Sequence, residues 1–157
     1  MSNRFLKPLY SFVYSERFDP RDFDARLKLQ KEIYLLQEEG IKVDDNYDFL
    51  WYKHGPYSQA LQNDILNLSN TPDISLKYTD EAKRILGDLR LMINSNTQYT
   101  VTNWVECLAS LQYLRSNVFG RSSKDIDIIN ELQKRKPHLN NVKENHKAIR
   151  LLKKYIG

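Results

Sequence analysis

The chain has 157 residues and a mass of 18.6 kDa, which suits a single domain. Its 41% hydrophobic and 28% charged residues are ordinary for a globular protein, and no uncharged run approaches the ~20 apolar residues that a membrane-spanning helix needs. Its one cysteine, Cys107, excludes an internal disulfide and a zinc site built on several cysteines, and we expect no secretion signal and a reducing, cytoplasmic location.

Two helices are expected before residue 41. Apolar side chains at three- and four-residue spacing indicate the first helix, over 4–14. The second, over 26–39, has the clearest pattern in the chain. Asp22 or Asp24 can cap its start, and Gly40 suits the position after its end.

A small β-hairpin or wing is expected in the middle of the chain. The aromatic run over 48–52 favours a strand, and the Gly55-Pro56 dipeptide after it predicts a turn. Ser58 is placed to cap a helix whose Leu61, Ile65 and Leu68 face inward. The alternation of apolar and polar residues over 74–78 predicts a second, half-buried strand.

The second half of the chain predicts four helices. Thr79 caps the first, whose inward residues are Ala82, Ile85, Leu86, Leu89 and Ile93. The next two span 103–118 and 123–136, with expected capping boxes at Asn103 with Glu106 and at Ser122 with Asp125. Their inward residues are expected to be Trp104, Leu108, Leu111, Leu114 and Val118, then Ile126, Ile129 and Leu132. The last helix covers 142–156, with Val142, His146, Ile149, Leu152 and Ile156 inward.

This order of elements predicts a mainly α, α+β fold. We expect one helical domain over 1–157, in which 1–22 form an N-terminal helix and turn. The middle segment of the chain has the element order of a winged helix-turn-helix. That fold places a helix pair before a small β-wing, and its second helix can enter a DNA groove. The sequence therefore indicates a helix-rich domain with a winged-helix-like core.

The charge is unevenly distributed. Residues 134–157 hold eight basic residues and one acid, a net charge of +7, so a total of +4 leaves −3 for the first 133 residues. Within those, the segment 16–48 has ten acids and six bases. A basic tail on a mildly acidic body points to an anionic partner, although two oppositely charged parts of one protein can also attract each other.

The residues that could support catalysis show no catalytic pattern. The histidines His54, His138 and His146 lack metal-ligand spacing, so we expect neither a metal nor a cofactor. Cys107 has no histidine nearby in sequence and is interpreted as a buried apolar residue. There is no phosphate-binding glycine loop and no nucleophile elbow. We therefore expect no enzyme, and a hydrolase built on Cys107 or His54 is the least favoured alternative.

Two groups of residues are candidate binding sites. Aromatic, cationic and hydroxyl side chains surround the Gly-Pro turn, a mixture that suits a protein partner or a nucleic acid; they are Tyr52, Lys53, His54, Tyr57 and Ser58. On the last helix, four cations recur at spacings of four, three and four and could bind an anion; they are Lys143, Lys147, Arg150 and Lys154. The competing interpretations are a turn that merely ends a strand and a solvated helix face.

Several segments together resemble a known family. They are Arg26-Leu27-Lys28-Leu29-Gln30-Lys31 with Tyr34-Leu35-Leu36 and Gly40, Phe49-Leu50-Trp51-Tyr52-Lys53-His54-Gly55-Pro56-Tyr57-Ser58 with Leu61 and Asp64, Glu106-Cys107-Leu108-Ala109-Ser110-Leu111 with Tyr113-Leu114, and Leu132 with Lys136-Pro137. Over 25–155 the chain is similar to YwgA-like proteins. These resemble the C-terminal half of DarG-type antitoxins and, more distantly, the Panacea domain of SocA-type antitoxins.

The resemblance implies a non-enzymatic module that binds and restrains a partner toxin or effector protein. It gives Tyr52, Gly55, Pro56, Tyr57 and Ser58 as a shared turn. DarG-type antitoxins also carry a macrodomain, and this chain has no room for one beside the matched region, so the macrodomain's hydrolase activity is not implied. The alternative function is a winged-helix-like transcriptional regulator that binds nucleic acid.

Overall fold

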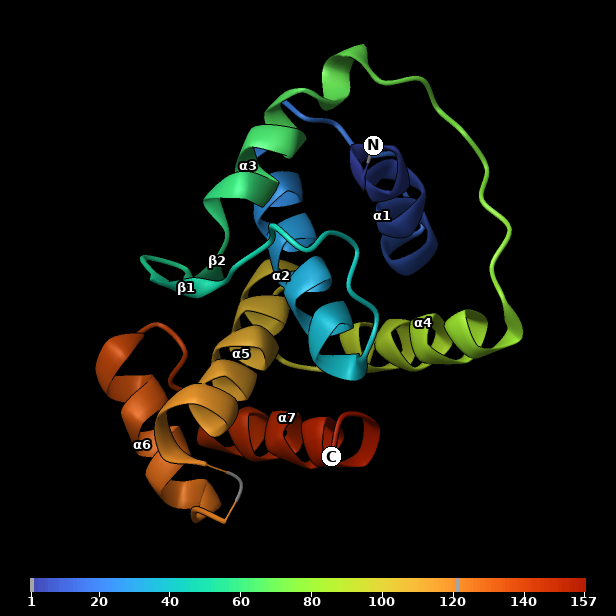
Figure 1. Ribbon diagram of the computed structural model, residues 1–157. Coiled ribbons are helices and arrows are strands. Elements are labelled where there is room, and N and C mark those ends of the chain that lie inside the picture. Colours follow the sequence, from blue (N-terminus) through green and yellow to red (C-terminus); the bar gives the residue numbers. More distant parts are fainter. Residues whose placement is uncertain (1, 121) are drawn as a thin grey trace.

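Helices α2 (Phe23–Glu39) and α5 (Val101–Tyr113) pack against each other at the centre of the molecule (Figure 1). This computed structural model describes residues 2–120 and 122–157, with side chains described over 4–120 and 122–157. The remaining elements surround the central pair, and α4 and β2 contact both of its helices. In chain order they are η1 (Ser2–Phe5), α1 (Leu6–Tyr14), β1 (Leu50–Tyr52), β2 (Gly55–Tyr57), α3 (Gln59–Leu66), η2 (Leu68–Asn70), α4 (Asp80–Ile93), the π-helical turn η3 (Leu114–Phe119), α6 (Asp125–Arg135) and α7 (Val142–Tyr155).

The expectation of a mainly helical α+β fold with a small hairpin is confirmed. β1 and β2 pair antiparallel, with Leu50 opposite Tyr57 and Tyr52 opposite Gly55. The second strand expected over 74–78 is wrong, because β2 directly follows the turn and pairs with β1 in its place. Residues 71–79, which we call the strap, run between η2 and α4 without pairing to a strand of the described chain (Figure 1).

Helix starts follow local capping in most cases. The side chains of Asp22, Ser58 and Thr79 accept backbone N–H groups at the starts of α2, α3 and α4, as the sequence predicts. The two capping boxes are wrong. Thr100 caps α5 by accepting from the N–H of Asn103, and α6 begins after Lys124 without a side-chain cap.

The residues predicted to face inward in α2 and α3 are buried, and those of the last two helices match in part, since Ile129, Leu132, Ile149 and Leu152 are buried as expected. In α6, Ile128 lies inside in place of Ile126, which is exposed. In α7, Asn145 and Ala148 are buried beside the predicted Ile149 and Leu152, whereas Val142 is exposed. Val118 of η3 is also exposed. These helices carry apolar residues on more than one side, so their neighbours decide which side is buried.

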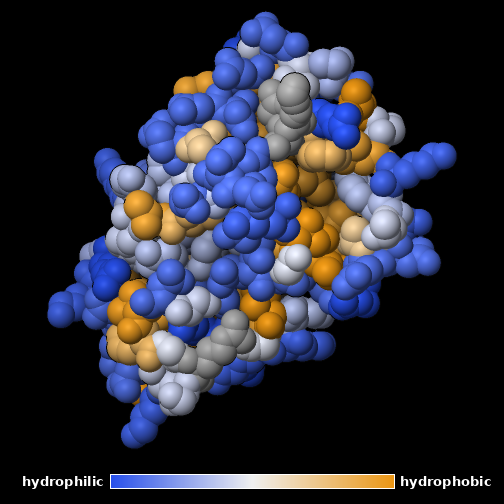
Figure 2. Space-filling view, in the orientation of Figure 1, coloured by the Kyte–Doolittle hydropathy of each residue, from blue (hydrophilic) through white to orange (hydrophobic). Residues whose placement is uncertain are grey.

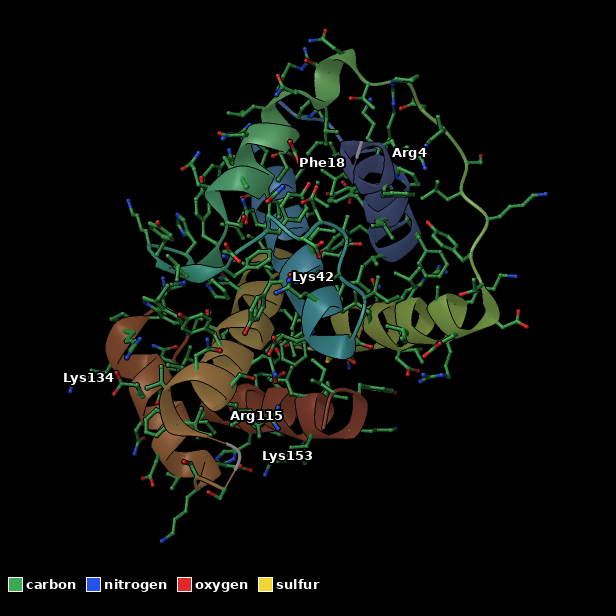
Figure 3. All side chains as sticks on the ribbon, in the orientation of Figure 1. Arg4, Phe18, Lys42, Arg115, Lys134 and Lys153 are labelled. Carbon is green, nitrogen blue, oxygen red and sulfur yellow. The ribbon has the colours of Figure 1, made fainter. Side chains whose placement is uncertain are left out.

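Arg115 connects the end of α5 to the end of α7. Its guanidinium is buried between the two helices (Figure 3), donates to Oε1 of Gln112 at 2.7 Å and donates to the carbonyl of Gly157 at 3.1 Å. Such a charge-assisted pair of bonds satisfies a group that is costly to bury alone. None of the helices in the described part of the chain is long and apolar enough to cross a membrane.

Candidate functional site

The turn between β1 and β2 lies directly on α5. Gly55 has φ +89°, a left-handed conformation that side chains rarely adopt. A Cβ atom added to Gly55 would lie 2.4 Å from Oγ of Ser110 on α5. Glycine is therefore required here both by the backbone conformation and by the close approach of the turn to the helix.

Two buried lysines hold this turn in place. Nζ of Lys31, on α2, donates to the carbonyl of Pro56 at 2.7 Å. Nζ of Lys136, after the end of α6, donates to the carbonyl of Lys53. Lys31 precedes the hairpin in the chain, and Lys136 lies 83 residues after Lys53. The conformation of the hairpin therefore depends on the packing of both halves of the chain.

A single carboxylate, Glu106 of α5, lies among these cations. It is 2% exposed, and its Oε2 lies 3.7 Å from Nζ of Lys136. Its Oε1 lies 3.1 Å from Nε2 of His138, an exposed residue two positions after Lys136. The carboxylate of Glu106 can be buried because it has an ion pair with Lys136 and a polar contact with the ring of His138.

The buried cluster has more positive than negative groups. Burial lowers the pKa of Lys31 to about 7; the nearby Glu106 carboxylate opposes that shift and the Lys136 ammonium adds to it. Burial also lowers the pKa of Lys136, again against the effect of Glu106. The pKa of His54 is lowered mainly by burial. Because the pKa of Lys31 is about 7, its positive charge is only partly present at neutral pH and increases as pH falls.

A hollow of about 460 Å³, which we call the hairpin pocket, opens beside Glu106. Its charged lining has three cations and two acids, a net charge of +1 before the histidines are counted; they are Lys53, Arg135, Lys136, Asp24 and Glu106. The first turns of α2 and α5 also line it, and helix N-termini carry partial positive charge. The pocket is thus suited to a negatively charged group.

Next to this pocket, the hairpin presents aromatic side chains to solvent. Phe23, Leu50 and Tyr52 are about half exposed, at 54%, 57% and 49%. The rings of Phe23 and His54 meet edge to face at 5.6 Å, and those of Tyr52 and Tyr57 at 5.1 Å. We call the group of Phe23, Leu50, Tyr52, Lys53, His54 and Tyr57 the hairpin surface; His54 and Tyr57 are half-buried and the others are exposed.

Of the five residues that the sequence indicates at this turn, four belong to the hairpin surface and Ser58 does not. Ser58 is buried, its Oγ accepts from the N–H of Leu61, and its backbone exchanges two hydrogen bonds with the Gln30 side chain. Its polar atoms are therefore used inside the protein, where they fix the start of α3.

The four cations of α7 lie on or near the solvent side of that helix. Lys143, Arg150 and Lys154 are exposed, whereas the half-buried Lys147 donates to the carbonyl of Asn96. Lys153 is paired with Asp125 at 2.7 Å and lies at the outer side of α7 (Figure 3). The structure thus brings the α7 cations together on one face, separate from the residues of the hairpin pocket.

The cysteine is placed where it cannot act as a surface nucleophile. Cys107 is buried, and its thiol donates to Oδ1 of Asn145 at 3.3 Å. Burial, with a smaller effect of Glu106 and Glu144, raises the pKa of this thiol well above its usual range. His138 and Glu106 form an acid–base contact at 3.1 Å. Over 4–120 and 122–157, no three His, Cys, Asp or Glu side chains are arranged to hold a metal ion.

Sequence reasoning missed the interior of the site. Lys31, Glu106 and Lys136 lie on three different helices or their ends, and Glu106 was assigned to a helix cap. Three polar residues on otherwise apolar faces of helices are the only local signal that they are buried together. Comparisons of the chain with protein-family models, with curated proteins and with solved structures find no match in any of the three.

Proposed function

We propose that this protein is a non-enzymatic, cytoplasmic binding module of antitoxin type, which restrains a partner toxin or effector protein through the hairpin surface. One observation carries the proposal: exposed aromatic and cationic side chains stand on a turn that is fixed from beneath by Lys31, Lys136 and the close contact of Gly55 with Ser110. A surface that is rigid before binding loses less conformational entropy when a partner docks.

The chemistry of the surface favours a partner with an acidic patch around an apolar centre. Tyr52 and Phe23 offer large exposed rings, and aromatic residues supply much of the binding energy in protein interfaces. The hairpin pocket beside them has an excess of positive charge, supplied in part by the exposed Lys53. Charge complementarity of this kind speeds association and selects partners. The resemblance to YwgA-like proteins agrees with a partner-binding role.

The proposal is tested by co-expression with a neighbouring gene product that is toxic when expressed alone. We expect the wild-type chain to restore growth and to co-elute with that product. The variant Tyr52→Ala with Lys53→Glu should lose both effects. The matched control is Leu91→Ala with Lys83→Glu, which makes the same kinds of change at exposed positions of α4 and should keep both effects. Growth rescue that survives the hairpin variant would contradict the proposal.

A second candidate function, nucleic-acid binding, is supported by the exposure of Lys143, Arg150 and Lys154 on α7. A row of cations can follow a phosphate backbone, and such binding weakens steeply as salt rises. We expect Lys143→Glu with Arg150→Glu to reduce binding to duplex DNA or RNA, and Lys83→Glu with Lys124→Glu, at exposed positions elsewhere, to change it less. Absence of binding at ~50 mM salt would exclude this function.

A further inference from the structure

The strap has the alternating sequence pattern of a β-strand, but no strand of the described chain pairs with it. Ile74, Leu76 and Tyr78 alternate with polar residues, and Leu76 and Tyr78 are half-buried while Lys77 is exposed. Figure 1 shows the strap as a long extended segment at the edge of the molecule. The backbone N–H and C=O groups of 73–78 make no hydrogen bond to the described part of the chain. They are therefore free to pair with another extended segment.

Side-chain contacts hold the middle of the strap against the protein, whereas backbone bonds involve only its ends, where the N–H of Thr71 donates to Leu68 and the carbonyl of Thr79 accepts from Lys83. Nζ of Lys7 donates to the carbonyl of Thr71 at 2.7 Å, and the carboxylate of Asp73 pairs with Lys7 at 3.3 Å and with Arg17 at 3.0 Å. The ring of Tyr78 meets that of Phe12 at 6.3 Å. The strap is thus attached to α1 and its vicinity in a way that leaves the backbone of 73–78 unused.

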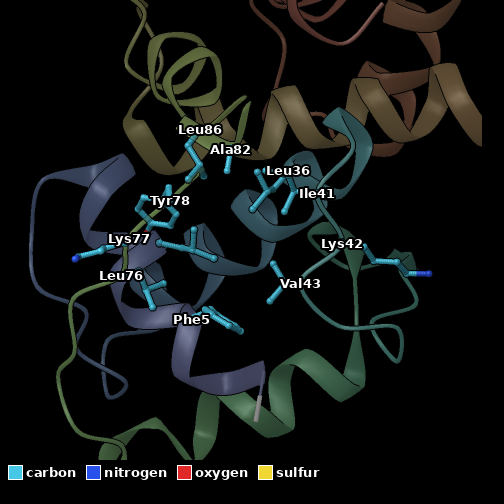
Figure 4. A pocket seen from close by; sticks show the side chains of 11 residues that line it. Phe5, Leu36, Ile41, Lys42, Val43, Leu76, Lys77, Tyr78, Ala82 and Leu86 are labelled. Atoms are coloured by element: carbon cyan, nitrogen blue, oxygen red, sulfur yellow. The ribbon is translucent and has the colours of Figure 1, made fainter. Parts of the chain in front are cut away.

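An apolar hollow of about 220 Å³ lies beside the strap, between residues 76–78 and residues 41–43 (Figure 4). Apart from the side chains of Lys42 and Lys77, its lining is apolar or aromatic; those residues are Phe5, Leu9, Leu36, Ile41, Val43, Leu76, Tyr78, Ala82 and Leu86. Figure 2 shows hydrophobic residues gathered in a hollow in the region bordered by α1, α2 and α4. An apolar cavity of ~150 Å³ suffices to bind benzene, so this hollow has room for one large apolar side chain.

Lys42 and Lys77 lie on opposite sides of this hollow and extend away from it (Figure 4). Both belong to segments without regular secondary structure, one on each wall. They are the only charged residues of the lining, which contains no acid, so the rim of the hollow is positively charged. The ligand that would match this hollow and its two lysines is an apolar side chain flanked by acidic residues.

We propose that the strap is a docking edge for an extended, acidic segment of a partner protein. The segment adds a β-strand to the backbone of 73–78, places an apolar side chain in the hollow and sets acidic side chains beside Lys42 and Lys77. In such β-strand addition, main-chain hydrogen bonds supply affinity, and pockets for alternate side chains supply specificity. Six residues of strap extend over roughly 20 Å, a usual strand length. This surface is distinct from the hairpin surface, and the inference does not depend on the proposed function.

The probe is a capped synthetic peptide of about eight residues that alternates glutamate with valine and has phenylalanine near its centre. Binding is measured by fluorescence anisotropy, and amide hydrogen exchange is followed by NMR. In the free protein, the amides of 73–78 should exchange rapidly because they are unbonded. In the complex, every second one of them should become protected by about tenfold or more, because a strand bonds only along one edge of its neighbour.

Variants separate the parts of the site. Ala82→Phe should fill the hollow and weaken peptide binding about tenfold or more, provided that thermal unfolding shows a folded protein. Lys42→Gln with Lys77→Gln leaves the apolar lining intact and should weaken binding in a salt-dependent way. The same peptide methylated on alternate backbone nitrogens should not bind, because its strand-forming donors are gone. Lys83→Gln with Lys124→Gln, at exposed positions outside the hollow, is the matched control and should leave binding unchanged.

Three results would overturn the inference. The first is absence of peptide binding at concentrations up to about 1 mM, which is well above the dissociation constant expected of a specific site. The second is binding that leaves the amides of 73–78 unprotected or that is insensitive to both Ala82→Phe and the lysine variant. The third is protection of these amides in the protein alone, together with a dimer on size exclusion, which would make a second copy of the chain the occupant.

Discussion

Lys31 reaches from the middle of α2 to the carbonyl of Pro56, at 2.7 Å, although only 1% of Lys31 is exposed. A buried ammonium group is costly unless its donors find acceptors, and the turn supplies one. The carboxylate of Glu106 adds a favourable charge interaction. The hairpin is therefore part of a buried polar network, and the proposed binding surface and the stability of the fold depend on the same few residues.

The stability of the protein should depend on pH through Lys31. Burial lowers the pKa of Lys31 to about 7 in the folded protein, whereas the unfolded chain has the ordinary value of 10.5. Between these values the unfolded state binds a proton that the native state lacks, so the free energy of unfolding rises with pH, by up to about 1.4 kcal/mol per unit. Below this window the cost of burying the charge is fully present.

Urea unfolding of the wild-type chain and of Lys31→Met over about pH 6–10 measures this effect, since the window follows from the linkage of proton binding to folding. The wild-type curve should be steeper than that of the variant, because other titrating groups are common to both. Parallel curves would show that Lys31 keeps its ordinary pKa in the folded protein.

Removal of the charge of Glu106 should destabilise the fold more than removal of a surface charge. Glu106→Gln leaves the buried ammonium of Lys136 without its carboxylate, and loss of one partner of a buried pair costs about 3–5 kcal/mol. Combining it with Lys136→Met should recover part of that loss. Glu131→Gln, which breaks the surface pair with Arg135, is the control and should change chemical denaturation little.

The contact between Gly55 and Ser110 predicts a pair of variants whose effects do not add. Gly55→Ala introduces left-handed strain of about 1–2 kcal/mol and a steric overlap of about 1–3 kcal/mol. Ser110→Ala removes the Oγ atom that a Cβ would meet at 2.4 Å, so in that background only the backbone strain should remain. Equal losses in both backgrounds, measured by a double-mutant cycle in urea, would place the turn away from α5.

Thr100 caps the start of α5, and the contribution of this cap to stability can be measured. Thr100→Ala removes the oxygen that accepts from the N–H of Asn103 at 3.2 Å and should cost about 1 kcal/mol. Asn103→Ala, at the position that the sequence pattern favours as a cap, should cost under about 0.5 kcal/mol. A larger loss for Asn103→Ala in thermal unfolding would reverse this assignment.

Cys107 should be chemically silent in the folded protein. Its buried thiol has a raised pKa, so very little reactive thiolate is present. At about pH 8, near the ordinary pKa of a cysteine, iodoacetamide should modify it only as fast as the protein opens. Thr100→Ala, which lowers stability without changing the charges around the thiol, should speed the reaction. Rapid modification that is indifferent to stability would mean that the thiol is accessible.

Local features of the chain were predictable from short stretches of sequence. Asp22, Ser58 and Thr79 cap helices because a cap needs only the two or three residues that follow it. Leu61, Ile65 and Leu68 are buried as the periodicity predicts. In α2 the predicted Leu29, Ile33 and Leu36 are buried too, but so is every residue between them, because this helix is central and is covered on all sides. A chain reversal near Gly55-Pro56 was predictable because glycine permits a positive φ and proline fixes φ, but the turn itself is formed by Lys53 and His54, and Gly55 and Pro56 begin β2.

The partners of each element were decided only by the tertiary structure. The segment 74–78 alternates like a strand, yet strand pairing needs a neighbour, and β2 took the place beside β1. Lys31, Glu106 and Lys136 are far apart in sequence and meet because α2, α5 and the end of α6 converge on one turn. The sequence by itself determined which segments become helices and where the chain turns, since those choices are local. The fold decided which polar groups share a buried site and which edge stays unpaired, since both depend on contacts between distant residues.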